Sequence, residues 1–429
     1  RVLLEASDAG LQVDLAYDDF TTPLGSLNPE RSYARLADRF ILARGQQWVQ
    51  PVQPRGFRFL GIDVAGRGQV RLLAVEALDE TYPFAPPMAL MTSDARLTDY
   101  ARRAAETVRI CTTDCFTDCA TRERVQWMED LYLHARVAAY TFGDTLLLRR
   151  ALFQAAQNAL PDGRINGFMP SERTGCAFAS SSLLWLHLLV DYWLYTGNQQ
   201  DLDRLLPCAR KLVQFLRQRA ATDGLLTWPG GQFWEWAPIE TSGCLLLTNA
   251  VWAWAWQRLS EHEGLRRGLG GDLAGEAAAI RQACHARFWD AERQLYRDSM
   301  PPAGQSPIFG QQANAMAVLA GICPSSERQA LLRRLIDPSQ LAPVAPGEAS
   351  LKPHNRAKPG QIVPVGTLWF GHFLCQALFE NGLATQALAQ MHLLWGAYDG
   401  LPTFPETRIQ AGNTFLCHGW AAGPAYLLP

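Results

Sequence analysis

The pattern of hydrophobic and polar residues changes once along the chain, near residue 92. Before that point, apolar and polar residues alternate in short runs at residues 11–15, 57–64 and 69–75, with Pro and Gly between the runs. Successive side chains point to opposite faces of a β-strand, so a period of two predicts half-buried strands. We therefore expect residues 1–92 to form an antiparallel, sandwich-like β domain.

From Ser93 onward, apolar residues recur every three to four positions, which is the period of amphipathic helices. Gly- and Pro-rich links separate the helical stretches, and no strong strand run interrupts them. So many short paired helices predict a mainly α fold, an (α/α)6 toroid of six hairpins over 93–429, because a simple bundle needs fewer and longer helices. A helical solenoid is the alternative, although no fixed repeat is visible. The predicted helices span 94–109, 124–140, 144–158, 179–196, 200–219, 242–260, 271–288, 309–320, 325–336, 365–381, 384–395 and 414–427.

Composition narrows the possible partners and compartments. The chain has 429 residues, 48% of them hydrophobic, and a formal net charge of −2. This charge argues against nucleic acid or an anionic membrane as a partner, and no apolar run reaches the roughly 20 residues of a membrane span. We expect a soluble protein, with the cytoplasm favoured over export. Because the sequence opens at Arg1, directly in a strand-like segment, we also expect a truncated N-terminus, which leaves export undecided. The oligomeric state stays open.

Ten cysteines are scattered along the chain, several of them in apolar helical contexts. Buried free thiols are the expected state of such residues. Cys111, Cys115 and Cys119 recur every four residues, but this spacing matches no known pattern of metal ligands. We therefore expect neither a metal nor another cofactor.

The densest candidate chemistry lies in residues 118–130, where four carboxylates, two arginines and a tryptophan share one passage from loop to helix. Arginines can hold some carboxylates ionised, while an apolar wall can keep another protonated. A tryptophan offers a flat face to a sugar ring. The combination is typical of the acid site of a glycosidase, and the alternative interpretation is a solvated, charged start of a helix.

Aromatic residues gather in the loops as well. Trp234 and Trp236 flank Glu235, and Trp420 follows closely after His418. An aromatic face matches the C–H face of a pyranose, so these loop tryptophans are candidates for sugar stacking. Packing in the core is the alternative for each of them.

The sequence Asp-Cys-Ala-Thr-Arg-Glu-Arg-Val-Gln-Trp-Met-Glu-Asp of residues 118–130 resembles the signature of bacterial α-L-rhamnosidases, glycoside hydrolase family 78. That signature runs approximately Asp-Cys-Pro-x-Arg-x-Glu-Arg-x-Gly-Trp-x-Gly-Asp. Segments 56–62, 191–198 and 417–420 also resemble the family, in the same order along the chain. The resemblance implies a β domain before the six-hairpin toroid. The chain stops before the C-terminal β-sandwich usual in the family, so a trimmed chain and a shorter relative both remain open.

The resemblance implies an inverting hydrolase that removes a terminal α-L-rhamnosyl residue from a glycoside or oligosaccharide. Glu123 aligns with the general acid and Glu406 with the general base, and Arg122 or Arg124 should fix Asp118 and Asp130. Inversion requires carboxyl groups about 6.5–9.5 Å apart, whereas about 5 Å indicates retention. The residues predicted to contact the sugar are Asp118, Arg122, Trp127, Glu129, Asp130, Trp234, Glu235, His418 and Trp420.

Several departures from the family pattern keep alternatives open. The motif is one residue short before Glu123, so Glu129 is a rival for the general acid. Ala120 and Pro405 stand where the family has Pro and Trp, which puts the sugar in doubt more than the hydrolytic class. Other six-hairpin glycosidases and a non-catalytic sugar-binding relative are therefore alternatives.

A further alternative is a zinc-dependent enzyme similar to the lanthionine cyclases, which share the α/α toroid and hold zinc with two Cys and one His. Cys417-His418-Gly419 resembles their last pair of ligands. Cys244 follows Gly243 but lacks the flanking Trp and Gly of their upstream motif. A catalytic zinc needs three protein ligands, and the sequence does not provide a third.

Overall fold

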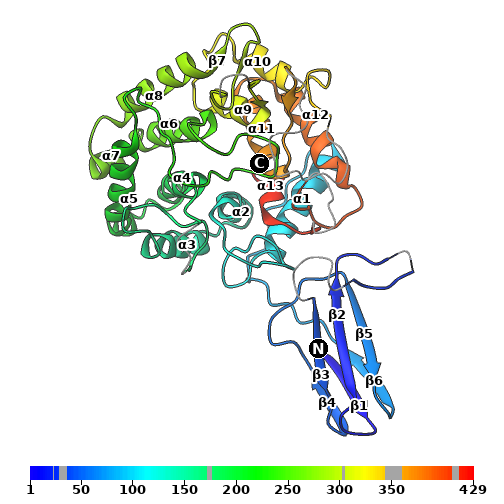
Figure 1. The fold of residues 1–429 in the computed structure, drawn as a ribbon. Helices are drawn as coiled ribbons and strands as arrows, with labels where there is room; N and C mark the ends of the chain where they lie inside the picture. The colour runs from blue at the N-terminus through cyan, green and yellow to red at the C-terminus, as the bar shows by residue number, and fades with distance from the viewer. Residues whose placement is uncertain (23, 29–35, 172–175, 302–304, 344–359, 408–414) are drawn as a thin grey trace.

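The computed structural model describes residues 1–22, 24–28, 36–171, 176–301, 305–343, 360–407 and 415–429. A small β domain at the N-terminus stands beside a ring of helices, and the last described residues lie within the ring (Figure 1). The predicted fold class is confirmed. The predicted boundary after residue 92 falls in the stretch between β6 and α1.

The β domain consists of two three-stranded antiparallel sheets, in the orders β4–β1–β6 and β3–β2–β5. Alternate residues of β1 and β2 point inward, and Val2, Leu4, Val13 and Leu15 form a core separate from that of the ring. The three predicted strands correspond to β2, β5 and β6. The strands β3 and β4 were not predicted, and their exposed faces mix polar and apolar side chains. The strands are β1 Val2–Ala6, β2 Gln12–Asp18, β3 Ala37–Ile41, β4 Gly45–Val49, β5 Phe59–Ala65 and β6 Val70–Val75.

Six inner helices form a closed ring, because each packs on the next and the last packs on the first. Each inner helix follows an outer helix, which completes six hairpins (Figure 1). The inner helices are α2 Met128–Phe142, α4 Ala179–Thr196, α6 Leu246–Ser260, α9 Gln311–Leu319, α11 Leu368–Glu380 and α13 Pro424–Leu427. The outer helices are α1 Ala95–Ile110, α3 Leu146–Gln157, α5 Gln199–Arg219, α8 Leu273–Phe288, α10 Arg328–Leu335 and α12 Ala384–Leu394.

The sequence determines which helices lie inside. Every residue of α4 from Ala179 to Tyr192 is buried, as expected for a helix that is apolar on all sides. In contrast, α5 buries one stripe that includes Leu205, Leu212 and Leu216 and exposes a charged face. Its first turn is capped by Asn198, whose side chain accepts the backbone N–H of Asp201.

Several helix predictions differ from the structure, and the helix predicted at 242–260 begins only at Leu246. The helix predicted at 124–140 begins only at Met128, because Arg124 has a left-handed backbone with φ of 53°. The helix predicted at 414–427 is a 3-10 turn at Gly419–Ala421 followed by the short α13, and residue 414 lies outside the described residues. Sequence analysis also missed α7 (Glu263–Leu269). Two-residue strands add short pairs in the helical part, β7 Trp289–Asp290 with β8 Leu295–Tyr296 and β9 Phe309–Gly310 with β10 Ile362–Val363.

A buried ion network ties three inner helices together. The carboxylate of Asp191 on α4 accepts hydrogen bonds from Arg136 on α2 at 2.8 Å and from Arg258 on α6 at 2.5 Å. Burial alone would raise the pKa of Asp191, but the two guanidinium groups lower it to about 2. Among the helices that the structure describes, none is long and apolar enough to cross a membrane.

Candidate active site

The loops before the inner helices gather at one end of the ring, because all six inner helices follow their outer partners in the same sense. Two of these loops meet where α2 and α13 close the ring. A backbone hydrogen bond from Gly419 N–H to the carbonyl of Asp118, at 2.9 Å, joins them. Within the loop before α13, His418 N–H donates to the carbonyl of Phe404, also at 2.9 Å. Only glycine fits at position 419, since a Cβ atom there would overlap Nε2 of His134. The two segments are thereby brought into register.

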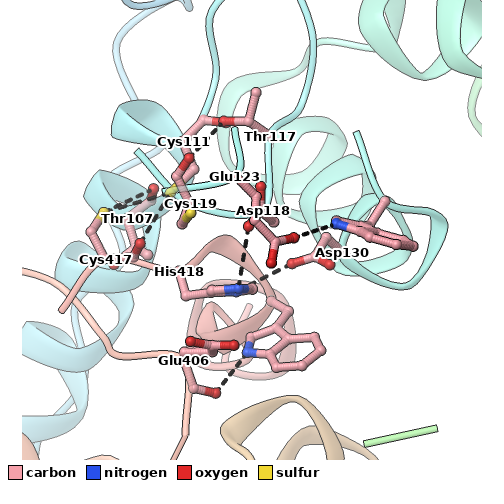
Figure 2. A network of polar contacts seen from close by, with 12 residues as sticks. Thr107, Cys111, Thr117, Asp118, Cys119, Glu123, Asp130, Glu406, Cys417 and His418 are labelled. Atoms are coloured by element: carbon pink, nitrogen blue, oxygen red, sulfur yellow. Dashed lines mark hydrogen bonds and ion pairs between the residues drawn. The ribbon is translucent and has the colours of Figure 1, made fainter. Parts of the chain in front are cut away.

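Where the two loops meet, His418 lies between the carboxylates of Asp118 and Asp130 (Figure 2). His418 Nδ1 lies 3.2 Å from Asp130 Oδ1, and Nε2 lies 3.9 Å from Asp118 Oδ2. Burial raises the pKa of Asp118 to about 6 and also raises that of Asp130. Burial alone would lower the pKa of His418, but the nearby carboxylates, Asp130 above all, raise it above its ordinary value. Asp118 Oδ1 accepts the N–H of Val125 at 2.8 Å, which leaves Oδ2 without a hydrogen-bond partner.

The two carboxylates predicted to do the chemistry share one arginine. Arg122 Nη2 lies 3.1 Å from Glu123 Oε1 and 3.3 Å from Glu406 Oε1. The Glu123 and Glu406 oxygens are therefore separated by no more than the sum of these two distances. Glu406 is buried, whereas the side chain of Glu123 is 38% exposed, so the pair runs from the rim of the site inward.

Two tryptophans donate hydrogen bonds to these two glutamates, one to a carboxylate and one to a backbone carbonyl. The indole N–H of Trp127 donates to Glu123 Oε2 at 2.8 Å, and that of Trp420 donates to the backbone carbonyl of Glu406 at 2.8 Å. The ring of Trp420 lies 4.6 Å from the imidazole of His418, centroid to centroid. The structure thus brings together Asp118, Arg122, Glu123, Trp127, Asp130, Glu406, His418 and Trp420, and their roles stay predictions.

Three other predicted sugar contacts lie inside the protein scaffold. Glu129 is buried and accepts hydrogen bonds from the hydroxyls of Ser180 at 2.6 Å and Ser181 at 2.8 Å. Trp234 is buried and donates its indole N–H to Thr248 Oγ1. The position of neither residue supports its predicted role.

Glu235 is likewise occupied by protein donors. Its carboxylate accepts the backbone N–H groups of Gly366 and Thr367 at the start of α11, the hydroxyl of Thr367 and the amide of Gln312. A buried carboxylate can be held in this way by the free N–H groups of a helix N-terminus. Glu235 therefore anchors one inner helix, and its position gives no support to contact with a sugar.

A second buried carboxylate, Asp298, joins two of the loops at this end of the ring. Its Oδ1 accepts the N–H of Gly310 at 2.7 Å, and its backbone carbonyl accepts the N–H of Leu246 at 2.9 Å. Oδ2 has no hydrogen-bond partner, and burial raises the pKa of Asp298 to about 7. Burial thus disfavours the ionised form of Asp298 in the folded protein, so the stability of the fold decreases when this carboxyl loses its proton.

The arginines act differently from the prediction that Arg122 or Arg124 fixes Asp118 and Asp130. Arg122 pairs with Glu123 and Glu406, and Arg124 donates from Nη1 to the carbonyl of Pro54 in the β domain at 2.7 Å. Arg124 has a left-handed backbone, and its side chain contacts the β domain and not Asp118 or Asp130.

Sequence reasoning missed two residues that contact these segments. The ring of Phe415 lies 5.2 Å from the guanidinium carbon of Arg122. Asp19, at the end of β2, accepts the N–H of Leu416 at 3.2 Å. No local pattern marks Phe415, and the only available signal for Asp19 was a pair of acidic residues directly after a strand.

The cysteine and histidine near the end of the chain have different partners. Cys417 Sγ lies 3.6 Å from Cys111 Sγ, while His418 turns to Asp130. Within the described ranges, no group of three or more His, Cys, Asp and Glu side chains is arranged to hold a metal ion. The geometry therefore gives no support to the zinc-dependent alternative.

Comparisons with known proteins agree with this architecture. A model of the bacterial alpha-L-rhamnosidase 6 hairpin glycosidase domain matches residues 88–342. The structure is similar to that of a family 78 rhamnosidase of Bacillus sp. GL1, with a TM-score of 0.84 and 24% identity over 100% of this chain and 44% of that one. A rhamnosidase from Klebsiella oxytoca with rhamnose bound gives a TM-score of 0.81 and 20% identity over 99% of this chain and 83% of that one.

A more distant similarity links the ring to another glycosidase family. The family 63 mannosylglycerate hydrolase of Thermus thermophilus gives a TM-score of 0.55 and 12% identity over 77% of this chain and 99% of that one. No curated protein matches the sequence. The chain spans less than half the length of the Bacillus protein.

Proposed function

The chain belongs to the family of bacterial α-L-rhamnosidase six-hairpin glycosidase domains, as a divergent member, and from this premise we propose that it is a glycoside hydrolase that removes a terminal α-L-rhamnosyl residue. The observation that carries this proposal is that Arg122 contacts the carboxylates of both Glu123 and Glu406. Two carboxylates at the mouth of a partly apolar site are the minimum equipment for hydrolysis of a glycosidic bond.

In the proposed reaction Glu123 is the general acid. It gives its proton to the oxygen of the leaving group as the bond to the anomeric carbon breaks. Its exposure at the rim supports this role, because a leaving aglycone must reach it from solvent. Glu129 is a poorer candidate, since its carboxylate is buried against Ser180 and Ser181.

Glu406 is the proposed general base. It takes a proton from a water molecule that attacks the anomeric carbon from the opposite face, which inverts the configuration. The distances to Arg122 set an upper limit on the separation of the Glu123 and Glu406 oxygens; this limit falls below the roughly 6.5–9.5 Å range of inverting enzymes and includes the roughly 5 Å of retaining ones. We propose that Arg122 draws back when sugar and water enter, so that this separation widens.

Asp118, Asp130 and His418 form the proposed grip on the sugar hydroxyls. Asp118 Oδ2 has no hydrogen-bond partner in the protein, and Asp130 Oδ1 lies 3.2 Å from His418 Nδ1. Each oxygen keeps a lone pair that can accept a hydroxyl. The raised pKa of His418 favours a positively charged imidazole between them, which keeps both carboxylates ready to accept. Trp127 supplies an apolar face beside Glu123.

The second candidate is a six-hairpin glycosidase with another substrate. Ala120 and Pro405 depart from the family pattern beside the two proposed catalytic segments, and the similarity to a family 63 hydrolase shows that this ring is shared by a different glycosidase family. A binding protein without activity is the remaining alternative.

The test is hydrolysis of 4-nitrophenyl α-L-rhamnoside beside a panel of other 4-nitrophenyl glycosides. Wild type is compared with Glu123→Gln, Glu406→Gln and a control, Glu263→Gln, which changes an exposed carboxylate on α7. We expect rhamnoside turnover that both catalytic variants lose and the control keeps. Turnover of another sugar would transfer the proposal to that substrate, and no turnover would favour a binding protein. Proton NMR of the first anomer released tests inversion directly.

A further inference from the structure

We propose that the β domain holds the two catalytic segments at their working separation, and that Asp19 is the positioning residue through which it holds Glu406. This inference rests on the proposed function. The β domain touches both segments of the site although its core is separate from that of the ring.

The contact with the segment of the general base comes from Asp19. It follows β2 directly, is 5% exposed, and accepts the backbone N–H of Leu416 at 3.2 Å across 397 residues of sequence. The carboxylate of Asp18 accepts the N–H of Asp19 at 2.7 Å, which fixes the turn that presents Asp19. A charged acceptor on a buried N–H makes a stronger hydrogen bond than a neutral one.

The position of Leu416 is passed on to both carboxylates through its neighbour Phe415. The carbonyl of Phe415 accepts the backbone N–H of Glu406 at 3.1 Å. The ring of Phe415 lies beside the guanidinium of Arg122, which contacts Glu123 and Glu406. A shift of residues 415 and 416 would therefore move Glu406 and the arginine that separates it from Glu123.

The contact with the segment of the general acid comes from residues 54–56. The carbonyl of Pro54 accepts a hydrogen bond from Arg124 at 2.7 Å. At Gly56, a Cβ atom would lie only 2.5 Å from the carbonyl oxygen of Ala120, so this strand entry and the loop are packed backbone to backbone. One small domain thus supports the loop of Glu123 and the loop of Glu406 at the same time.

Catalysis depends steeply on such positioning, because a misplacement of about 1 Å can reduce turnover about a hundredfold. We expect Asp19→Ala to lower kcat at least about tenfold while KM stays within about twofold. Asp19→Asn keeps an acceptor of the same shape and should restore most of the turnover. The matched control is Asp14→Ala, which removes a carboxylate of β2 that pairs with Arg39 at 2.7 Å on the domain surface.

The inference would be overturned by a kcat of Asp19→Ala equal to that of Asp14→Ala, or by a loss of turnover that Asp19→Asn does not recover. A parallel loss of thermal stability in Asp19→Ala alone, with an equal rise in KM, would also overturn it, because that result indicates unfolding rather than misplacement.

Hydrogen exchange separates this inference from the proposed activity, since it needs no substrate. Peptides that cover residues 404–407 and 118–127 should exchange faster in Asp19→Ala than in Asp14→Ala. Unchanged exchange in both peptides would overturn the inference. Faster exchange in a chain that hydrolyses no glycoside would contradict the proposed function and leave the positioning by Asp19 supported.

Discussion

Replacement of Asp298 by Asn should stabilise the protein at alkaline pH and leave it nearly unchanged at acidic pH. Asp298 is fully buried, its Oδ2 atom lacks a partner, and burial raises its pKa from 3.8 to about 7. Asn has the same shape and can still accept the N–H of Gly310, but it never carries a charge.

The size of the effect follows from proton linkage. Between about pH 4 and pH 7 the folded protein keeps a proton on Asp298 that the unfolded chain releases, so the free energy of unfolding falls as the pH rises through this window. One pKa unit corresponds to about 1.4 kcal/mol, so the full penalty above pH 7 is on the order of 4 kcal/mol. Asp298→Asn removes this penalty.

The assay is thermal unfolding of both proteins from pH 5 to pH 8.5, followed by circular dichroism. The control is Asp203→Asn, an exposed carboxylate on α5. We expect the midpoint of Asp298→Asn to exceed that of wild type increasingly as the pH rises, while the control shows no trend. A difference between Asp298→Asn and wild type that does not change with pH, or a variant less stable than wild type at pH 8, would refute the reasoning.

Four further substitutions have expected outcomes. Glu123→Gln and Glu406→Gln should each lower kcat at least about a hundredfold with little change in melting temperature, as measured on the preferred 4-nitrophenyl glycoside. Asp191→Ala leaves two arginines inside the ring without their carboxylate and should reduce the free energy of unfolding by about 3–5 kcal/mol in urea titrations, whereas a loss below about 1 kcal/mol would contradict the ion network. Gly419→Ala forces a methyl group onto His134, so we expect loss of turnover and destabilisation by roughly 1–3 kcal/mol, and a fully active, equally stable variant would show that the junction tolerates a side chain.

Much of the fold could be predicted because the helical period is strong. The inner helices are apolar on nearly all sides and the outer helices on one stripe, so their existence is apparent from local sequence. The errors occur where local preference is overruled. Arg124 belongs to a helical pattern but adopts a left-handed backbone to reach Pro54, which delays α2 to Met128. Tertiary contacts of this kind leave no periodic trace.

The candidate site was predictable where residue types are packed densely in sequence. The cluster at 118–130 and the pair of His418 and Trp420 converge in the structure. In contrast, Glu129 and Glu235 look like site carboxylates in sequence, and only the structure shows that Ser180 and Thr367 occupy them. Sequence distance also conceals Asp19, whose partner lies 397 residues away.

The proposed site lies where α2 packs on α13, so its parts are synthesised at different times and come together only when the ring closes. Residues 118–130 leave the ribosome well before Glu406 and His418, by roughly 15–60 s at about 5–20 residues per second. Until the last hairpin docks, Asp118 and Asp130 have no histidine between them and Glu123 has no partner carboxylate. Activity should therefore appear in one step, when α13 packs on α2 and closes the ring. Separation of α2 from α13 alone should abolish activity while the other hairpins stay folded.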